Sequence, residues 1–97
     1  MPPFPRKSAT RKNYKDTQYL WHMQHKDGKT LLQIEMTAVV SGQTLVADLP
    51  RIVNQAMIEA AIDYGRANGW TPDKAAPPFR CKYLRGQFTR LDSEASS

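Results

Sequence analysis

The fold is decided by the stretch Thr17–Val40, which reads TQYLWHMQHKDGKTLLQIEMTAVV. At its centre, Asp27-Gly28 is a dipeptide that favours the positive φ angles of a tight type I′ turn between antiparallel strands. On both sides of this turn, side chains alternate in a period of two, as they do in strands of a sheet with one dry face. The stretch therefore predicts a β-hairpin. We expect its dry face to carry these residues: Trp21, Met23, Leu32, Ile34 and Met36.

The segments after the hairpin predict one helix and further strands. Residues 41–44 form a turn, and Leu45–Ala47 can form a short third strand. Asp48-Leu49-Pro50 is expected to start a helix, because proline suits the first helical position and aspartate caps free amides. The helix should run to about Asn68, where Gly69 stops it. Residues 79–88 predict a final strand.

The fold class that follows is α+β. We expect a small antiparallel sheet of three to four strands, in the order β-β-β-α-β, with one main helix packed on one face. The 97 residues are enough for one domain. We place a basic, disordered tail at residues 1–16, the domain at residues 17–91 and a flexible C-terminal tail at residues 92–97.

The composition indicates where in the cell we expect the protein to be. No apolar run approaches the roughly 20 residues that span a bilayer, and the N-terminus lacks the apolar stretch of a secretory signal. Cys81 is the single cysteine of the chain, so it cannot form an intramolecular disulfide. These features favour a cytoplasmic protein with no membrane partner.

The net charge of +5 is unevenly placed. Residues 1–16 carry five basic side chains against Asp16, which gives +4, and residues 79–97 carry four against two, which gives +2. Residues 17–78 carry five against six. A basic surplus of this kind attracts polyanions. A solubilising tail is the alternative explanation.

The predicted helix has two apolar sides, and this feature suggests a partner. One stripe suits packing on the sheet: Val53, Ala56, Met57, Ala60, Tyr64 and Ala67. Ile58 and Ile62 lie on the opposite side, where Ala61 and Gly65 leave room for close approach. We therefore expect an interface formed by Ile58, Ala61, Ile62 and Gly65. It could be covered by a second copy, a partner protein or the chain's own termini, or it could stay exposed.

Candidate catalytic chemistry has a simpler structural explanation at each position. His22 and His25 should point to opposite faces of a strand, so they cannot hold one metal from there. Cys81 alternates with Phe79 and Tyr83, which predicts a buried, unreactive thiol. Glu59 and Asp63 read as a solvated helix edge. We therefore expect neither an enzyme nor a cofactor or metal site.

An alternative function is nucleic-acid binding by the basic tail and the final strand. A basic strand beside polar neighbours could contact phosphates. The aromatic residues of the predicted sheet fall on its core-facing side, which argues against base stacking on the open face. The residues expected to take part are Arg6, Lys7, Arg11, Lys12, Lys15, Arg80 and Lys82.

The segment from Ala60 to Phe79 combines an alanine-bearing helix, Gly69-Trp70-Thr71-Pro72 and Pro78-Phe79. It resembles short uncharacterised bacterial proteins of the mobile-element or gene-cassette type, in which a helix ends in Gly-Trp-x-Pro before a closing strand. The resemblance covers about a fifth of the chain. It implies a helix-to-strand connection and a bacterial source, but no activity.

The function predicted from the sequence is a non-enzymatic interaction domain, a homodimer or a subunit bound to a partner protein.

Overall fold

Three tight turns of one kind build most of the sheet. The computed structural model describes residues 8–40 and 42–91. Its hairpins turn at Lys15-Asp16, Asp27-Gly28 and Arg85-Gly86, and all six of these residues have φ between 50° and 80°. Positive φ at both central positions is what a type I′ hairpin turn requires. The hairpin predicted at Asp27-Gly28 is therefore confirmed, and two more of the same kind accompany it.

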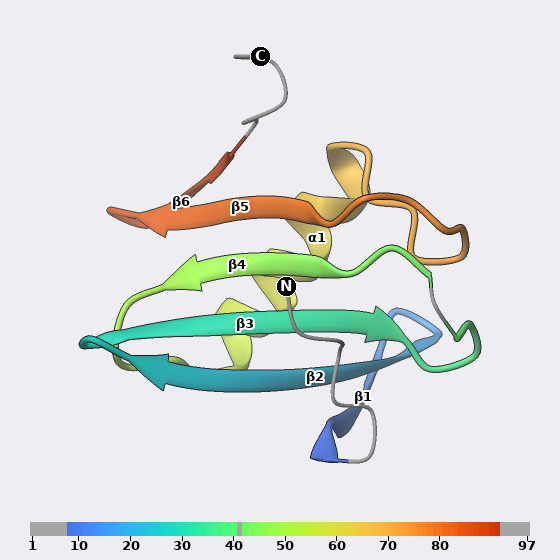
Figure 1. The fold of residues 1–97 in the computed structure, drawn as a ribbon, viewed down its shortest axis with the longest axis horizontal. Coiled ribbons are helices and arrows are strands. Elements are labelled where there is room, and N and C mark those ends of the chain that lie inside the picture. Colours follow the sequence, from blue (N-terminus) through green and yellow to red (C-terminus); the bar gives the residue numbers. More distant parts are fainter. Residues whose placement is uncertain (1–7, 41, 92–97) are drawn as a thin grey trace.

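The sheet has six strands where we expected three to four (Figure 1). The strands are β1 (Thr10–Tyr14), β2 (Thr17–Lys26), β3 (Lys29–Met36), β4 (Leu45–Leu49), β5 (Phe79–Leu84) and β6 (Gln87–Arg90). They lie in sequence order, and all pairs are antiparallel except β4 with β5. The α+β class is confirmed. The β-β-β-α-β order is extended by a strand at each end, and the sheet is mixed.

The two extra strands lie where we predicted a tail and a single final strand. Residues 10–14 pair with β2, so the prediction of a disordered tail over residues 1–16 is wrong for this part of it. Residues 1–7 and the predicted C-terminal tail at 92–97 lie outside the described residues. The expected final strand over 79–88 is interrupted at Gly86, whose φ of 80° lets the chain reverse.

One helix, α1 (Gln55–Ala67), connects the parallel strands β4 and β5 and covers one face of the sheet (Figure 1). It starts later than predicted, because Asp48 and Leu49 belong to β4, where both neighbouring strands pair with it. Asn54 caps the helix by accepting a 2.9 Å hydrogen bond from the amide of Met57. The expected stop is confirmed, since Gly69 follows the C-cap with φ of 105°.

The core lies between α1 and the sheet. On β3, Leu32 and Ile34 are fully buried, and Trp21 and Met23 pack against the same cluster. The predicted dry face of the hairpin is therefore the helix-facing side, with Met36 half-buried at its edge. The opposite face, which we call the helix-free face, is drier than expected. Gln33 and Glu35 are buried there, and Glu35 accepts a 2.7 Å hydrogen bond from the hydroxyl of Thr44.

The two outer hairpins hold the flanks of α1. On one flank, Tyr64 stacks on Phe88 of β6 with ring centroids 5.6 Å apart. Arg90 lies over the Phe79 ring and donates a 3.1 Å hydrogen bond to the carbonyl of Asn68 at the helix end. On the other flank, side chains of the β1–β2 hairpin contact helix carboxylates. The helix is therefore fixed at both sides, which determines which of its faces meets the sheet.

Candidate nucleic-acid interface

The interface predicted on the helix is buried inside the protein's own core. Ile58, Ala61 and Ile62 are 1%, 0% and 2% exposed, and Gly65 is buried with them. The prediction that these residues face outward is therefore wrong. The outward side instead carries small alanines at positions 56, 60 and 67, all of them exposed.

Two physical reasons favour the observed orientation. Isoleucines remove more apolar surface from water than alanines do, at about 25 cal/mol per Å². In addition, Gly65 on the buried side has no side chain, which lets the helix approach the sheet closely. A Cβ atom built on Gly65 would lie 2.5 Å from Leu45 Cδ1 and 2.9 Å from Trp70 Cε3. Self-association remains a prediction, but the four helix residues expected to form its interface are buried within the chain itself.

Two lysines predicted to bind phosphate are already paired with carboxylates. Lys12 lies 3.0 Å from Glu59, and Lys15 lies 2.9 Å from Asp63. The hydroxyl of Tyr14 also donates a 2.6 Å hydrogen bond to Asp63. The Tyr14 hydrogen bond, followed by that of Lys15, lowers the pKa of Asp63 from its ordinary value of 3.8. These contacts fasten β1 to α1, so Lys12 and Lys15 are poorly placed for a polyanion.

The remaining predicted residues divide into two groups. Arg6 and Lys7 lie outside the described residues. Arg11 is exposed on the helix-free face, since it pairs with Leu20 in the β1–β2 register. Arg80 and Lys82 are exposed on the same face, beside Val46 and Asp48 of the parallel neighbour β4. The prediction that Arg80 and Lys82 lie on the face opposite the core is therefore confirmed.

The tertiary structure adds two cations that were not predicted, Lys26 and Lys29, and places them at the same end of the sheet as Arg85. Lys26 and Lys29 are direct cross-strand partners next to the Asp27-Gly28 turn, and both are exposed. Arg85 occupies the β5–β6 turn. The β2–β3 and β5–β6 turns lie at the same end of the sheet (Figure 1). We call Lys26, Lys29, Lys82 and Arg85 the basic end.

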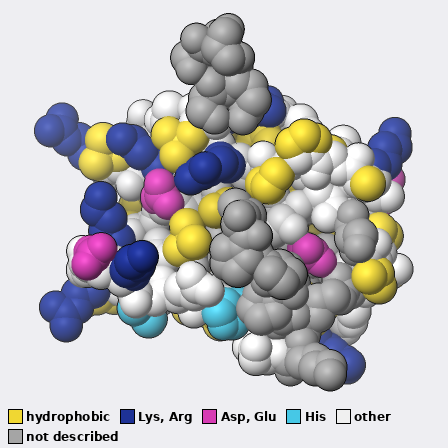
Figure 2. Space-filling model, viewed as in Figure 1, with side chains coloured by type: hydrophobic (Ala, Val, Ile, Leu, Met, Phe, Trp, Pro, Cys, Tyr) yellow, Lys and Arg dark blue, Asp and Glu magenta, His cyan; other side chains and the backbone are white. Residues whose placement is uncertain are grey.

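Figure 2, which views the helix-free face, shows Lys and Arg side chains gathered toward this end, with acidic side chains among them. Two hollows open between these residues. One, of about 270 Å³, is lined by Lys26, Lys29 and Asp48 among others. The second, of about 420 Å³, lies between Lys29 and Lys82 and also borders Asp48. The basic end is thus a shallow surface on which four cations surround two carboxylates, those of Asp27 and Asp48.

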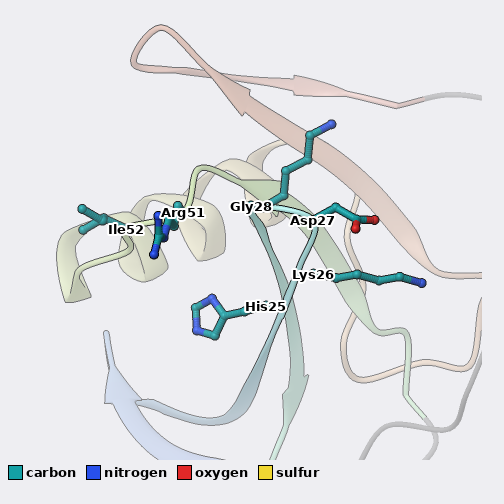
Figure 3. A pocket seen from close by; sticks show the side chains of 7 residues that line it. His25, Lys26, Asp27, Gly28, Arg51 and Ile52 are labelled. Carbon is teal, nitrogen blue, oxygen red and sulfur yellow. The ribbon is translucent and has the colours of Figure 1, made fainter.

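A third hollow, of about 600 Å³, lies on the other side of the same turn. Figure 3 shows the side chains of His25, Arg51 and Ile52 on one side of the hairpin and those of Lys26 and Asp27 on the other. The hydroxyl of Thr30 donates a 3.1 Å hydrogen bond to the carbonyl of Arg51. That hydroxyl has a single hydrogen, so it accepts from His25 Nδ1 at 2.9 Å. Arg51 therefore adds a cation on the helix side of the basic end.

A signal for part of the basic end was present in the sequence. Two residues that flank a two-residue hairpin turn must face each other, so Lys26-Asp27-Gly28-Lys29 already implied a lysine pair. Arg85-Gly86 is a weaker turn signal. The position of Lys82 near this pair could not be predicted from the sequence. It depends on the parallel pairing of β5 with β4, two strands that α1 connects.

Cys81, His22 and His25 are the side chains considered above for nucleophilic and metal chemistry. Burial, followed by the charge of Asp48, raises the pKa of the Cys81 thiol to about 12. Cys81 is fully buried, as predicted. His22 and His25 lie on opposite faces of β2. Within residues 8–40 and 42–91, no three side chains among His, Cys, Asp and Glu come together as metal ligands.

No helix in the described part of the chain has the length and apolar content to cross a bilayer.

Comparison with family descriptions, with curated proteins and with solved structures finds no match for this chain. The resemblance to mobile-element and gene-cassette proteins therefore stays a prediction.

Proposed function

We propose that the protein binds nucleic acid by its phosphate backbone, through the basic end of the helix-free face. The observation that carries this proposal is the opposed pair Lys26 and Lys29, cross-strand partners in the register of β2 and β3. Like charges directly opposite each other destabilise a hairpin. A bound polyanion would remove that repulsion.

The distribution of ion pairs supports the same reading. Among the described residues, the ion pairs within 4.0 Å are Lys12–Glu59 and Lys15–Asp63, both on the helix side of the molecule. None of the four cations of the basic end has a carboxylate at that distance within residues 8–40 and 42–91. The helix carboxylates are thus partly neutralised, while the cations of the basic end remain available to a ligand.

The chemistry expected is electrostatic and not sequence-specific. Each lysine or arginine that contacts a phosphate releases condensed counterions, so the logarithm of affinity falls linearly with the logarithm of salt concentration. Four contacts would give a slope of about −3.6 for a double helix, at about 0.9 per phosphate. Base-specific recognition would need bidentate contacts in a groove, and nothing in this proposal depends on them.

The experiment is fluorescence anisotropy of labelled oligonucleotides with the full chain over a salt series. We expect binding at low salt that weakens steeply as salt rises. The Lys26→Gln/Lys29→Gln variant should weaken binding about tenfold and make the salt slope shallower by about two. The matched control is Arg66→Gln/Lys74→Gln, which removes the same charge from exposed sites away from the basic end and should have little effect.

Two results would contradict the proposal. The first is the absence of binding at low salt by wild-type protein whose circular dichroism shows that it is folded. The second is an equal loss of affinity in the basic-end variant and the control variant, because net charge alone would then explain the binding.

A further inference from the structure

The aromatic residues indicate which form of nucleic acid the surface suits. All eight aromatic side chains in the described ranges belong to the core or pack against it on the helix-facing side: Tyr14, Tyr19, Trp21, Tyr64, Trp70, Phe79, Tyr83 and Phe88. None of these rings is therefore available on the helix-free face as a stacking platform. Proteins that bind single strands derive much of their affinity from stacking bases on aromatic rings. A surface that offers charge without rings suits a ligand whose bases are already paired.

The spacing of the cations points the same way. The register Leu31↔Asp48↔Lys82 places Lys82 two strands from β3 and two residues along from Lys29. At about 4.8 Å between strands and about 3.4 Å per residue, the Cα atoms of Lys29 and Lys82 lie about 12 Å apart. Lys26 is beside Lys29, and Arg85 follows Lys82 toward the same end. The basic end thus consists of two cation pairs separated by β4.

This separation is comparable to the width of a nucleic-acid groove, which is about 12 Å for the major groove of B-form DNA. We infer that the ligand is a double helix, with Lys26 and Lys29 on one phosphate backbone and Lys82 and Arg85 on the other. Asp48 lines the hollow between the two pairs. There it faces the groove and stays apart from the phosphates, so its negative charge is compatible with binding. This inference rests on the proposed function and names the ligand of the same surface.

The test compares three labelled probes of one sequence with the full chain: duplex DNA, duplex RNA and single-stranded DNA, each about two helical turns long. We expect at least one duplex to bind about tenfold more tightly than the single strand. The two duplexes distinguish the source, and a preference for either supports a two-backbone ligand. A single strand that binds as tightly as both duplexes would overturn the inference while leaving the proposed function standing.

Variants test the division into two pairs. Lys26→Gln/Lys29→Gln and Lys82→Gln/Arg85→Gln should each make the salt slope for the duplex shallower by about two, and their effects should add. Arg66→Gln/Lys74→Gln is again the control. If one pair alone accounts for the duplex slope, the ligand does not bridge β4 and the inference fails. If no probe binds at all, it is the proposed function that fails.

Discussion

The close approach of α1 to the sheet can be tested at Gly65, in the middle of the buried helix face. A Cβ atom at this position would lie 2.5 Å from Leu45 Cδ1 and 2.9 Å from Trp70 Cε3, both closer than carbon atoms approach in packed cores. Trp70 cannot easily move. It stacks on Tyr19, with ring centroids 5.8 Å apart, and its Nε1 donates a 2.8 Å hydrogen bond to the carbonyl of Gln43.

Two effects of Gly65→Ala oppose each other. Alanine improves helix propensity over glycine by about 1 kcal/mol. Overpacking a well-packed core costs about 1–3 kcal/mol, and the two close contacts with buried side chains place this site toward the upper end. We therefore expect Gly65→Ala to lower the free energy of unfolding by about 1–2 kcal/mol. For a domain of this size, each kcal/mol corresponds to a fall of roughly 4–8 °C in Tm.

The assay is urea unfolding followed by the fluorescence of the two tryptophans, Trp21 and the buried Trp70. The exposed substitution Ala60→Gly isolates the propensity term and should cost about 1 kcal/mol. In a Leu45→Val background, which removes the Cδ1 atom, Gly65→Ala should cost clearly less than in the wild type. A gain in stability from Gly65→Ala in the wild type, or an equal cost in both backgrounds, would refute the packing argument.

Two further predictions concern the same helix. Ile62→Asp should unfold the protein, because it places a carboxylate without a partner in a site that is 2% exposed, which costs several kcal/mol. Circular dichroism and size-exclusion chromatography would then show a loss of structure. A folded monomer would instead mean that Ile62 faces outward. Asp63→Asn should reduce the pH dependence of the free energy of unfolding. The hydrogen bonds from Tyr14 and then Lys15 lower the pKa of Asp63 in the folded state. The Asp63 carboxylate therefore stabilises the fold above its unfolded pKa, and this stabilisation is lost as the pH falls through the lower folded pKa. Urea unfolding should therefore separate wild type from Asp63→Asn at neutral pH and bring them together in strong acid, and an unchanged difference at low pH would count against this coupling.

The basic end was partly predictable from the sequence. The period-two pattern placed Arg80 and Lys82 on the face opposite the core, and the structure confirms their exposure there. Lys12 and Lys15 were assigned to the ligand because of the charge of the predicted basic tail. This assignment missed that residues 10–14 form a strand whose side chains reach Glu59 and Asp63, more than 40 positions away in sequence.

The sequence by itself determined the features that depend on a few neighbouring residues. Asp27-Gly28 and Gly69 adopt positive φ, which marks the turn and the helix end, and alternation sorted the strands into two faces. Only the tertiary structure decided which side of α1 is buried, because the helix has two apolar stripes of comparable length. The choice depends on how closely Gly65 can approach Leu45 and Trp70, which come from other elements. Backbone conformation is encoded locally, whereas the orientation of a two-sided helix depends on the shape of the surface it packs against.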